Sequence, residues 1–183
     1  MEKLQSFLER LNHEQNISLN DIPEIDLYMD QVIQLFENKF NGTRRNEDEK
    51  ILTKTMINNY AKGKLLFPIK NKKYSKEHII LISLIYQLKG ALSIKDIQAT
   101  LQGIHEQATE GNLDIFYERY LQESEENIDS IKEDVNTRME KSIIEDDEYL
   151  SKVLLIASLA NMSNLYRRAA EKLVDDIVMG EVE

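Results

Sequence analysis

Five polar side chains recur at helical spacing in the middle of the sequence and could contact a nucleic acid. They turn away from the apolar stripe that Met56, Ile57 and Tyr60 form on a helix expected over residues 53–62, with Thr53 as its N-cap. The five are Lys54, Thr55, Asn58, Asn59 and Lys62. Asparagine can form two hydrogen bonds with adenine, threonine can contact a thymine methyl or a phosphate, and lysine contacts phosphates. The alternative interpretation is an ordinary polar, solvated helix face.

More lysines follow this helix and could bind phosphates. They surround a tight turn that we expect between two short extended segments, 65–67 and 72–74, which together resemble a small wing. These lysines are Lys64, Lys70, Lys72 and Lys73. Tyr74 could donate its hydroxyl to a phosphate, although packing is its more common role. The alternative is a lysine-rich face that only keeps the protein soluble.

The distribution of charge changes what the net charge implies. The chain carries 23 Lys and Arg against 33 Asp and Glu, and the net charge of −10 alone argues against a polyanionic partner. Residues 43–100 nevertheless carry +7, whereas residues 1–42 carry −5 and residues 101–183 carry −12. A basic segment therefore lies between acidic flanks. Those acids could confine DNA to the basic segment by repulsion, or they could be ordinary surface charge.

The surrounding sequence predicts a mainly all-α fold. Six glycines and two prolines in 183 residues favour long helices over a turn-rich sheet. We expect an N-terminal amphipathic helix within residues 1–19 and a second helix near 26–40. An almost wholly apolar helix should follow from Ser75 to Leu88 as the core, and a short helix over 93–101.

Two long helices should complete the chain, at about 112–143 and from the acidic segment 145–148 to about 180. The first carries a partial heptad, which we interpret as a dimerisation stripe. Its members are Leu121, Ile128, Ile131 and Val135. We expect an antiparallel hairpin or a dimer bundle in a helical domain over 112–183 that dimerises or receives an effector. The sequence does not identify that effector, which could be a hydrophobic small molecule or a protein.

Little in the sequence points to catalysis, a metal or a cofactor. The chain has no cysteine, which excludes disulfides, thiolate metal sites and cysteine nucleophiles. His13, His78 and His105 lie in different segments without metal-ligand spacing, and neither a nucleotide-binding glycine loop nor a nucleophile elbow occurs. The acids at 145–148 are typical of a helix N-terminus rather than of a Mg²⁺ site. We therefore expect that the protein is not an enzyme.

No segment of the sequence predicts a membrane span. The longest apolar run, Ile79 to Leu88, is much shorter than the ~20 residues that cross a bilayer. The N-terminal residues lack the pattern of a signal peptide. We expect a cytoplasmic protein.

Residues 52–68 and 73–101 resemble the winged helix-turn-helix domain of MerR-type transcriptional regulators. The resemblance is carried by Thr53, Tyr60, Gly63, Leu65, Leu66, Pro68, Tyr74, Ser75, Gly90, Ser93, Ile94, Asp96 and Ile97. Segments 26–31, 52–60 and 72–78 are also similar to a bacterial family of unknown function, number 1836 of the domain-of-unknown-function series, which is itself taken as MerR-like. The resemblance implies a winged helix-turn-helix module over 20–102 with a minimal two-strand wing.

Three features depart from the MerR-type pattern. Thr55 and Asn58 occupy positions where that family usually has arginines, so direct contact between arginine and guanine is absent. The wing at 69–73 is short, and the insert at 43–50 lengthens the connection before the recognition helix.

These observations together predict a dimeric, sequence-specific DNA-binding transcriptional regulator. Its recognition helix, residues 53–62, would enter the major groove of double-stranded DNA, and each chain of a homodimer would read one half-site. The alternative is a protein–protein interaction module that keeps the helix-turn-helix fold without binding DNA.

Overall fold

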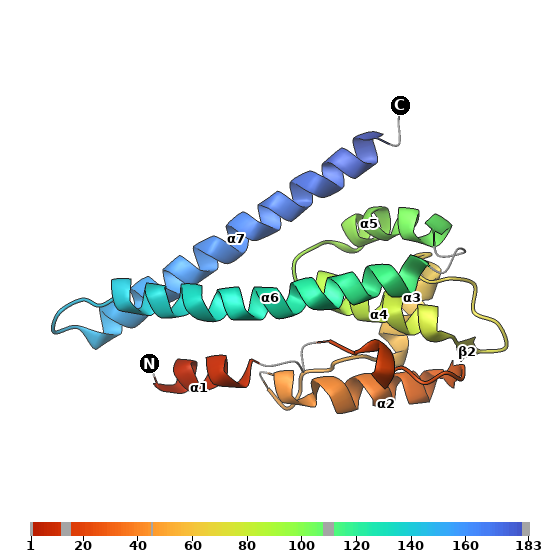
Figure 1. Cartoon of the computed structure of the whole chain (residues 1–183), viewed down its shortest axis with the longest axis horizontal. Helices are drawn as coiled ribbons and strands as arrows, with labels where there is room; N and C mark the ends of the chain where they lie inside the picture. Colours follow the sequence, from red (N-terminus) through yellow and green to blue (C-terminus); the bar gives the residue numbers. More distant parts are fainter. Residues whose placement is uncertain (1, 12–15, 45, 108–111, 181–183) are drawn as a thin grey trace.

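Helices linked by short turns make up most of the chain, as the computed structural model in Figure 1 shows. The structure describes residues 2–11, 16–44, 46–107 and 112–180. The elements in chain order are α1 (Glu2–Arg10), η2 (Leu19–Asp21), β1 (Leu27–Tyr28), α2 (Met29–Phe40), η3 (Asn41–Thr43), α3 (Lys54–Lys62), β2 (Lys73–Tyr74), α4 (Lys76–Leu88), α5 (Ile94–Gln107), α6 (Asn112–Lys141) and α7 (Glu148–Gly180). The mainly helical fold class predicted from the sequence is confirmed.

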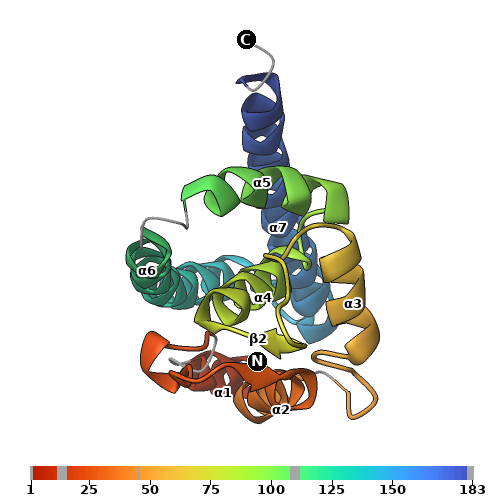
Figure 2. The same cartoon turned by 90° about the vertical axis from the view of Figure 1, so that its right-hand side faces the viewer.

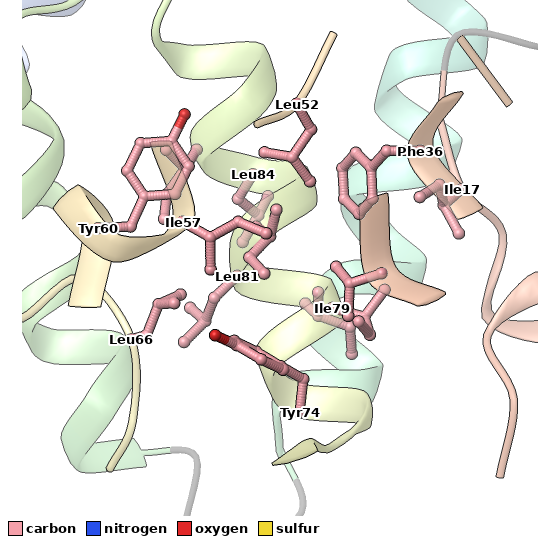
Figure 3. Packing of buried hydrophobic residues seen from close by; sticks show 14 of the residues in the cluster. Ile17, Phe36, Leu52, Ile57, Tyr60, Leu66, Tyr74, Ile79, Leu81 and Leu84 are labelled. Atoms are coloured by element: carbon pink, nitrogen blue, oxygen red, sulfur yellow. The ribbon is translucent and has the colours of Figure 1, made fainter. Parts of the chain in front are cut away.

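Helix α4 is the core around which the basic segment folds. All residues from His78 to Ile85 are buried, as expected for a helix that is apolar on nearly every side. Phe36 of α2 and Ile57 and Tyr60 of α3 point toward it (Figure 3). This packing fixes the buried side of α3 and leaves its other side in solvent.

Side-chain hydrogen bonds cap the helices where the sequence predicts their starts. The Thr53 hydroxyl accepts from the amide of Met56 at 3.1 Å at the start of α3. Ser93 and Asp96 form a reciprocal capping box at α5, with distances of 3.1 and 3.2 Å. Helix α5 then continues to Gln107, beyond the predicted end near residue 101.

A two-stranded antiparallel sheet is present, but its first strand is not the one predicted. Leu27 pairs with Tyr74 and Tyr28 with Lys73, so β2 pairs with β1 and not with residues 65–67. Leu65 and Leu66 are instead buried in the core, which uses their side chains without strand pairing. The helix expected from residue 26 begins at Met29, because the residues before it are extended.

A polar cluster joins the N-terminal segment to α4 and α6. The Asn16 side chain donates to Ser124 Oγ at 2.7 Å and accepts from Gln87 Nε2 at 3.0 Å and from the Tyr120 hydroxyl at 3.2 Å. The hydroxyl of Tyr117 is also satisfied, since it donates to the carbonyl of Ile17 at 2.8 Å. Burial raises the pKa of Tyr117 and Tyr120 to about 12, so both remain neutral donors.

Helices α6 and α7 contact each other near their connection and then diverge (Figure 1). Close to the connection, Val135 and Leu155 are buried and Arg138 Nη1 donates to Ser158 Oγ at 2.9 Å. Farther along, α7 leaves α6 and contacts α5, and Val174 in this last third of α7 is buried. The predicted antiparallel hairpin is therefore limited to the part next to the turn.

Among the residues that the structure describes, no helix combines the length and the hydrophobicity that a membrane span requires.

Candidate nucleic-acid interface

The outer side of α3 exposes all five polar side chains that the sequence predicts there. Ile57 and Tyr60 are buried at 0% and 6% exposure on the inner side. The exposed residues are Lys54, Thr55, Asn58, Asn59 and Lys62. Within the described residues, neither Asn58 nor Asn59 has a side-chain hydrogen bond, so their amide groups are available to a ligand.

Helix α3 ends in a Schellman motif that places Lys64 in the left-handed conformation. The amide of Leu65 donates to the carbonyl of Tyr60 at 2.9 Å, and the amide of Lys64 donates to the carbonyl of Ala61 at 3.1 Å. Lys64 has a φ of 55°, where glycine is the usual residue. The neighbouring Gly63 has a φ of −75°, so the lysine rather than the glycine carries the strained conformation.

A second left-handed lysine lies in the turn before β2. The amide of Lys73 donates to the carbonyl of Lys70 at 2.9 Å, and φ is 52° at Asn71 and 59° at Lys72. Two successive positive φ angles define a type I′ turn, which asparagine and glycine favour. Lysine at the second position costs about 1–2 kcal/mol relative to a relaxed backbone. Lys70, Asn71 and Lys72 all project as exposed residues at this turn.

The turn is held against α4 by His78, whose imidazole is buried. The Nδ1 atom of His78 accepts from the backbone amide of Ser75 at 3.1 Å, and Nε2 lies 3.2 Å from the carbonyl oxygen of Phe67. An accepting Nδ1 leaves Nε2 protonated, so Nε2 donates to Phe67 in the neutral tautomer. Burial lowers the pKa of His78 below its ordinary value, although the hydrogen bond to Phe67 and the charges of Glu77 and Asp26 oppose this shift. His78 therefore connects the chain before the turn to the core helix.

Several lysines of the basic segment, residues 43–100, form contacts within the chain. Lys76 pairs with Asp114 at 2.8 Å, and Lys89 donates to the carbonyl of Ile51 at 3.2 Å. Lys54 lies 2.7 Å from Asp30, but both side chains are largely exposed and such pairs contribute little. Lys73 lies over the ring of Tyr28, with Nζ 5.4 Å from its centroid.

Four lysines at the same end of the molecule have no ion pair with any residue that the structure describes. They are Lys62, Lys64, Lys70 and Lys72, and all four are exposed. Helix α3 and strand β2 both lie at this end, opposite the connection between α6 and α7 (Figures 1 and 2). We call Lys62, Lys64, Lys70, Lys72 and the exposed side of α3 the basic end.

Tyr74 is the one residue of the predicted DNA-binding set that is buried. It is 3% exposed, and its ring lies 5.7 Å from that of His78, centroid to centroid. Burial also raises the pKa of Tyr74. Its role is packing between β2 and α4, because a buried hydroxyl cannot reach a phosphate in solvent.

The left-handed lysines could not be identified as such from residue types. In the pair Asn71-Lys72, the asparagine is typical of a type I′ turn but the lysine is not, so the pair alone does not predict this turn. Gly63 suggests a helix end, but the strained position falls one residue later. The local sequence carries no signal for Asp30 as the partner of Lys54.

The predicted dimerisation stripe on α6 is largely covered by the chain itself. Val135 is 4% exposed, and Leu121 packs on the edge of the core. Ile128 and Ile131 line a groove together with Leu11 and Tyr166. Ile131, at 39%, is the most exposed of the four.

No cluster of His, Cys, Asp or Glu among the described residues could hold a metal ion. The lysine- and asparagine-rich surface can bind an anion or a hydrogen-bonding polymer, and it carries no nucleophile paired with a base. The side chains of His13 and His105 lie outside the described residues.

Comparisons with known proteins give one match. No curated protein and no solved structure is significantly similar to this chain. A family model described as "Domain of unknown function (DUF1836)" matches residues 17–121, from the buried Ile17 to the first third of α6. The match includes α2, α3, the type I′ turn, α4 and α5, and so contains the whole basic end. Because it spans more than half of the sequence, the chain belongs to the DUF1836 family.

Proposed function

We propose that this protein is a dimeric, sequence-specific DNA-binding transcriptional regulator with a winged helix-turn-helix module. In this proposal α2 and α3 are the helix-turn-helix pair, and α3 enters the major groove. The type I′ turn at Lys70–Lys73 acts as a minimal wing that contacts phosphates. These roles of the basic end follow what the resemblance of residues 52–68 and 73–101 to MerR-type regulators implies.

One observation carries the proposal: the four unpaired lysines of the basic end, two of them held at positive φ. Glycine or asparagine would relieve the strain at both Lys64 and Lys72, so the lysines are kept at a conformational cost. Strained residues that persist in a fold are typical of binding and catalytic sites. Positive charges at the tips of two turns are well placed to contact a polyanion.

The unpaired amides of Asn58 and Asn59 supply the means to read sequence. Asparagine recognises adenine through its N6 and N7 atoms, and the exposed Thr55 can contact a thymine methyl. Lysines outside α3 contribute affinity without sequence preference. The acids of the remaining chain repel phosphate and restrict DNA to this end. Affinity should therefore depend strongly on salt.

Selection of genomic DNA fragments by the full-length protein tests this function directly. The proposal expects a set of enriched fragments that share a symmetric motif, followed by a mobility shift of those fragments at low and at moderate salt. Enrichment no different from that of a bead-only control, and no shift at either salt, would refute it.

One feature favours a second candidate, a protein–protein interaction module without DNA binding. Helix α7 exposes many large apolar side chains, among them Tyr149 at 73% and Ile156 and Leu173 at 66%. Such faces typically mark protein contacts. A protein that shifts no DNA at any salt, but binds another protein through α7, would support this second function.

A further inference from the structure

Helix α7 carries an exposed face along its first two thirds that the rest of the chain leaves uncovered. Its members recur at helical spacing and all are exposed. They are Tyr149, Val153, Ile156, Ala157, Ala160 and Arg168, and we call this set the outer face of α7. The opposite side of the same stretch contacts α6, where Ser151 and Leu155 are buried.

The area of the outer face suits a dimer. Tyr149, Val153 and Ile156 are 73%, 42% and 66% exposed, and Leu150 and Leu154 beside them are 47% and 46% exposed. Together these five side chains present on the order of 500 Å² of apolar surface, near the upper limit for the largest patch on a monomer. With its polar margins, a helix face of this length approaches the ~800 Å² per partner of a standard interface.

The two ends of the outer face carry opposite charges, so they complement the ends of a second copy that runs antiparallel to the first. The exposed acids Glu145 and Asp146 precede the face, and the exposed Arg168 ends it. None of these three has an ion pair with any residue in the described ranges. Two antiparallel copies would place each arginine beside the acids of the other chain, and a two-fold axis produces that contact twice. A parallel arrangement would place like charges together.

Small residues lie at the middle of the face. Halfway between the acids and Arg168 are Ala157 and, one turn later, Ala160, about 15 Å from either end at 1.5 Å per residue. Alanine at the point of closest approach lets two helices pack tightly without clashes, while Val153 and Ile156 fill the flanking space.

We propose that two copies of this chain pair through the outer face of α7 in an antiparallel arrangement. Ala157 lies beside the partner's Ala157, and Arg168 contacts the partner's Glu145 and Asp146. This surface supplies the dimer that the proposed function needs, but the inference stands on α7 and does not require DNA binding. It also differs from the α6 stripe predicted from the sequence.

Light scattering coupled to size exclusion tests the interface with two matched variants. Ile156→Glu adds a charge to the outer face and should give a monomer. Leu173→Glu adds the same charge at a side chain of the same 66% exposure that lies outside the outer face, about 100° around α7 from Ile156, and should leave the dimer intact. Both sites are exposed, so both variants should keep the helical content of the wild type, measured by circular dichroism at room temperature. The measurement uses about 100 µM protein, well above a micromolar Kd. A monomeric wild type at this concentration, or equal disruption by both variants, would overturn the proposal.

Cross-linking tests the antiparallel register. Because the chain has no cysteine, Ala157→Cys introduces a single thiol that should form an intermolecular disulfide under mild oxidation. Ala169→Cys places a thiol at another exposed alanine on the other side of the helix and should remain largely reduced. Preferential cross-linking of Ala169→Cys would contradict the register.

Charge reversal tests the end contacts. Arg168→Glu should weaken the dimer about tenfold, and combining it with Glu145→Lys and Asp146→Lys should restore the affinity. Failure of the combined variant to recover would exclude this pairing. A monomer that still binds DNA would reject this inference and the dimeric form of the proposed regulator but not its DNA binding, whereas a dimer that binds no DNA would reject the proposed function and leave this inference standing.

Discussion

The backbone amide of Lys73 donates a hydrogen bond to the carbonyl of Lys70 at 2.9 Å, and this bond closes the turn that presents two exposed lysines of the basic end, Lys70 and Lys72. Between Lys70 and Lys73 the chain turns through left-handed conformations at Asn71 and Lys72. The turn thus combines a defined backbone geometry with a residue that this geometry disfavours. Its charge and its stability can be varied separately.

Lys72→Gly should stabilise the protein and weaken its binding to DNA. Glycine adopts a φ of 59° without steric cost, so the free energy of unfolding should rise by about 0.5–1 kcal/mol after the entropic cost of glycine. Removal of the positive charge should lower DNA affinity for all sequences. Urea unfolding and fluorescence anisotropy with labelled DNA measure the two effects.

Lys72→Ala is the matched control, because it removes the charge and keeps the strained conformation. It should reduce DNA affinity to the same extent without a gain in stability. If Lys72→Gly binds DNA as tightly as the wild type, the turn does not contact phosphate.

Asn58→Ala should relax the sequence preference at one base pair. Removal of two hydrogen bonds to an adenine should cost about 1–3 kcal/mol on the preferred site and little on random DNA. Competition binding with single-base variants of the selected site measures this difference. Asn38→Ala, at an exposed position on α2, is the control and should leave the preference unchanged. Equal weakening on preferred and random DNA would contradict base recognition by Asn58.

Stability should fall as the pH decreases below about 6.5, the ordinary pKa of histidine, because His78 is buried as the neutral form. Its pKa in the folded protein is lowered by burial, so the unfolded chain binds the additional proton first. The contribution of His78 is therefore fully present above the unfolded pKa and is lost as the pH falls toward the folded one. Urea unfolding between pH 5 and pH 8 (roughly the range in which histidine titrates) measures this effect.

His78→Gln tests the assignment to this residue. Glutamine can accept from the Ser75 amide and donate to the Phe67 carbonyl, but it does not titrate. The variant should show a weaker dependence of stability on pH across the same range. An unchanged dependence would assign the titration to another group.

Asn16→Ala should destabilise the protein by about 1–3 kcal/mol, because it removes the three hydrogen bonds that the Asn16 side chain forms with Ser124, Gln87 and Tyr120. The matched control is Asn20→Ala, which changes an exposed asparagine four residues later. Thermal unfolding of both variants makes the comparison, and equal melting temperatures would show that the cluster contributes nothing to stability.

Local patterns in the sequence predict the helices and the exposed side of α3 well. Thr53, Ser75 and Ser93 mark helix starts because capping depends on residues only a few positions apart. The apolar run from Ile79 to Ile85 predicts the core helix, since it leaves no polar side for solvent.

Contacts between distant residues cannot be predicted in this way. The pairing of Leu27 with Tyr74 joins segments far apart in the chain, and neither segment alone selects its partner. The divergence of α7 from α6 follows from its packing on α5, which no heptad in either helix indicates. The sequence alone allows Tyr74 either to pack in the core or to donate its hydroxyl to a phosphate, because tyrosine suits both places. Its burial in the structure shows that it packs in the core.

The salt dependence of DNA binding tests the central claim most directly. A double variant, Lys70→Ala with Lys72→Gly, should reduce the slope of log K against log[salt] by about 0.9 for each phosphate that is no longer neutralised, close to two units in total. Lys172→Ala, which removes an exposed lysine of α7, should leave the slope unchanged. A slope that is the same for the wild type, the double variant and this control would contradict the account of the basic end as a DNA-binding surface.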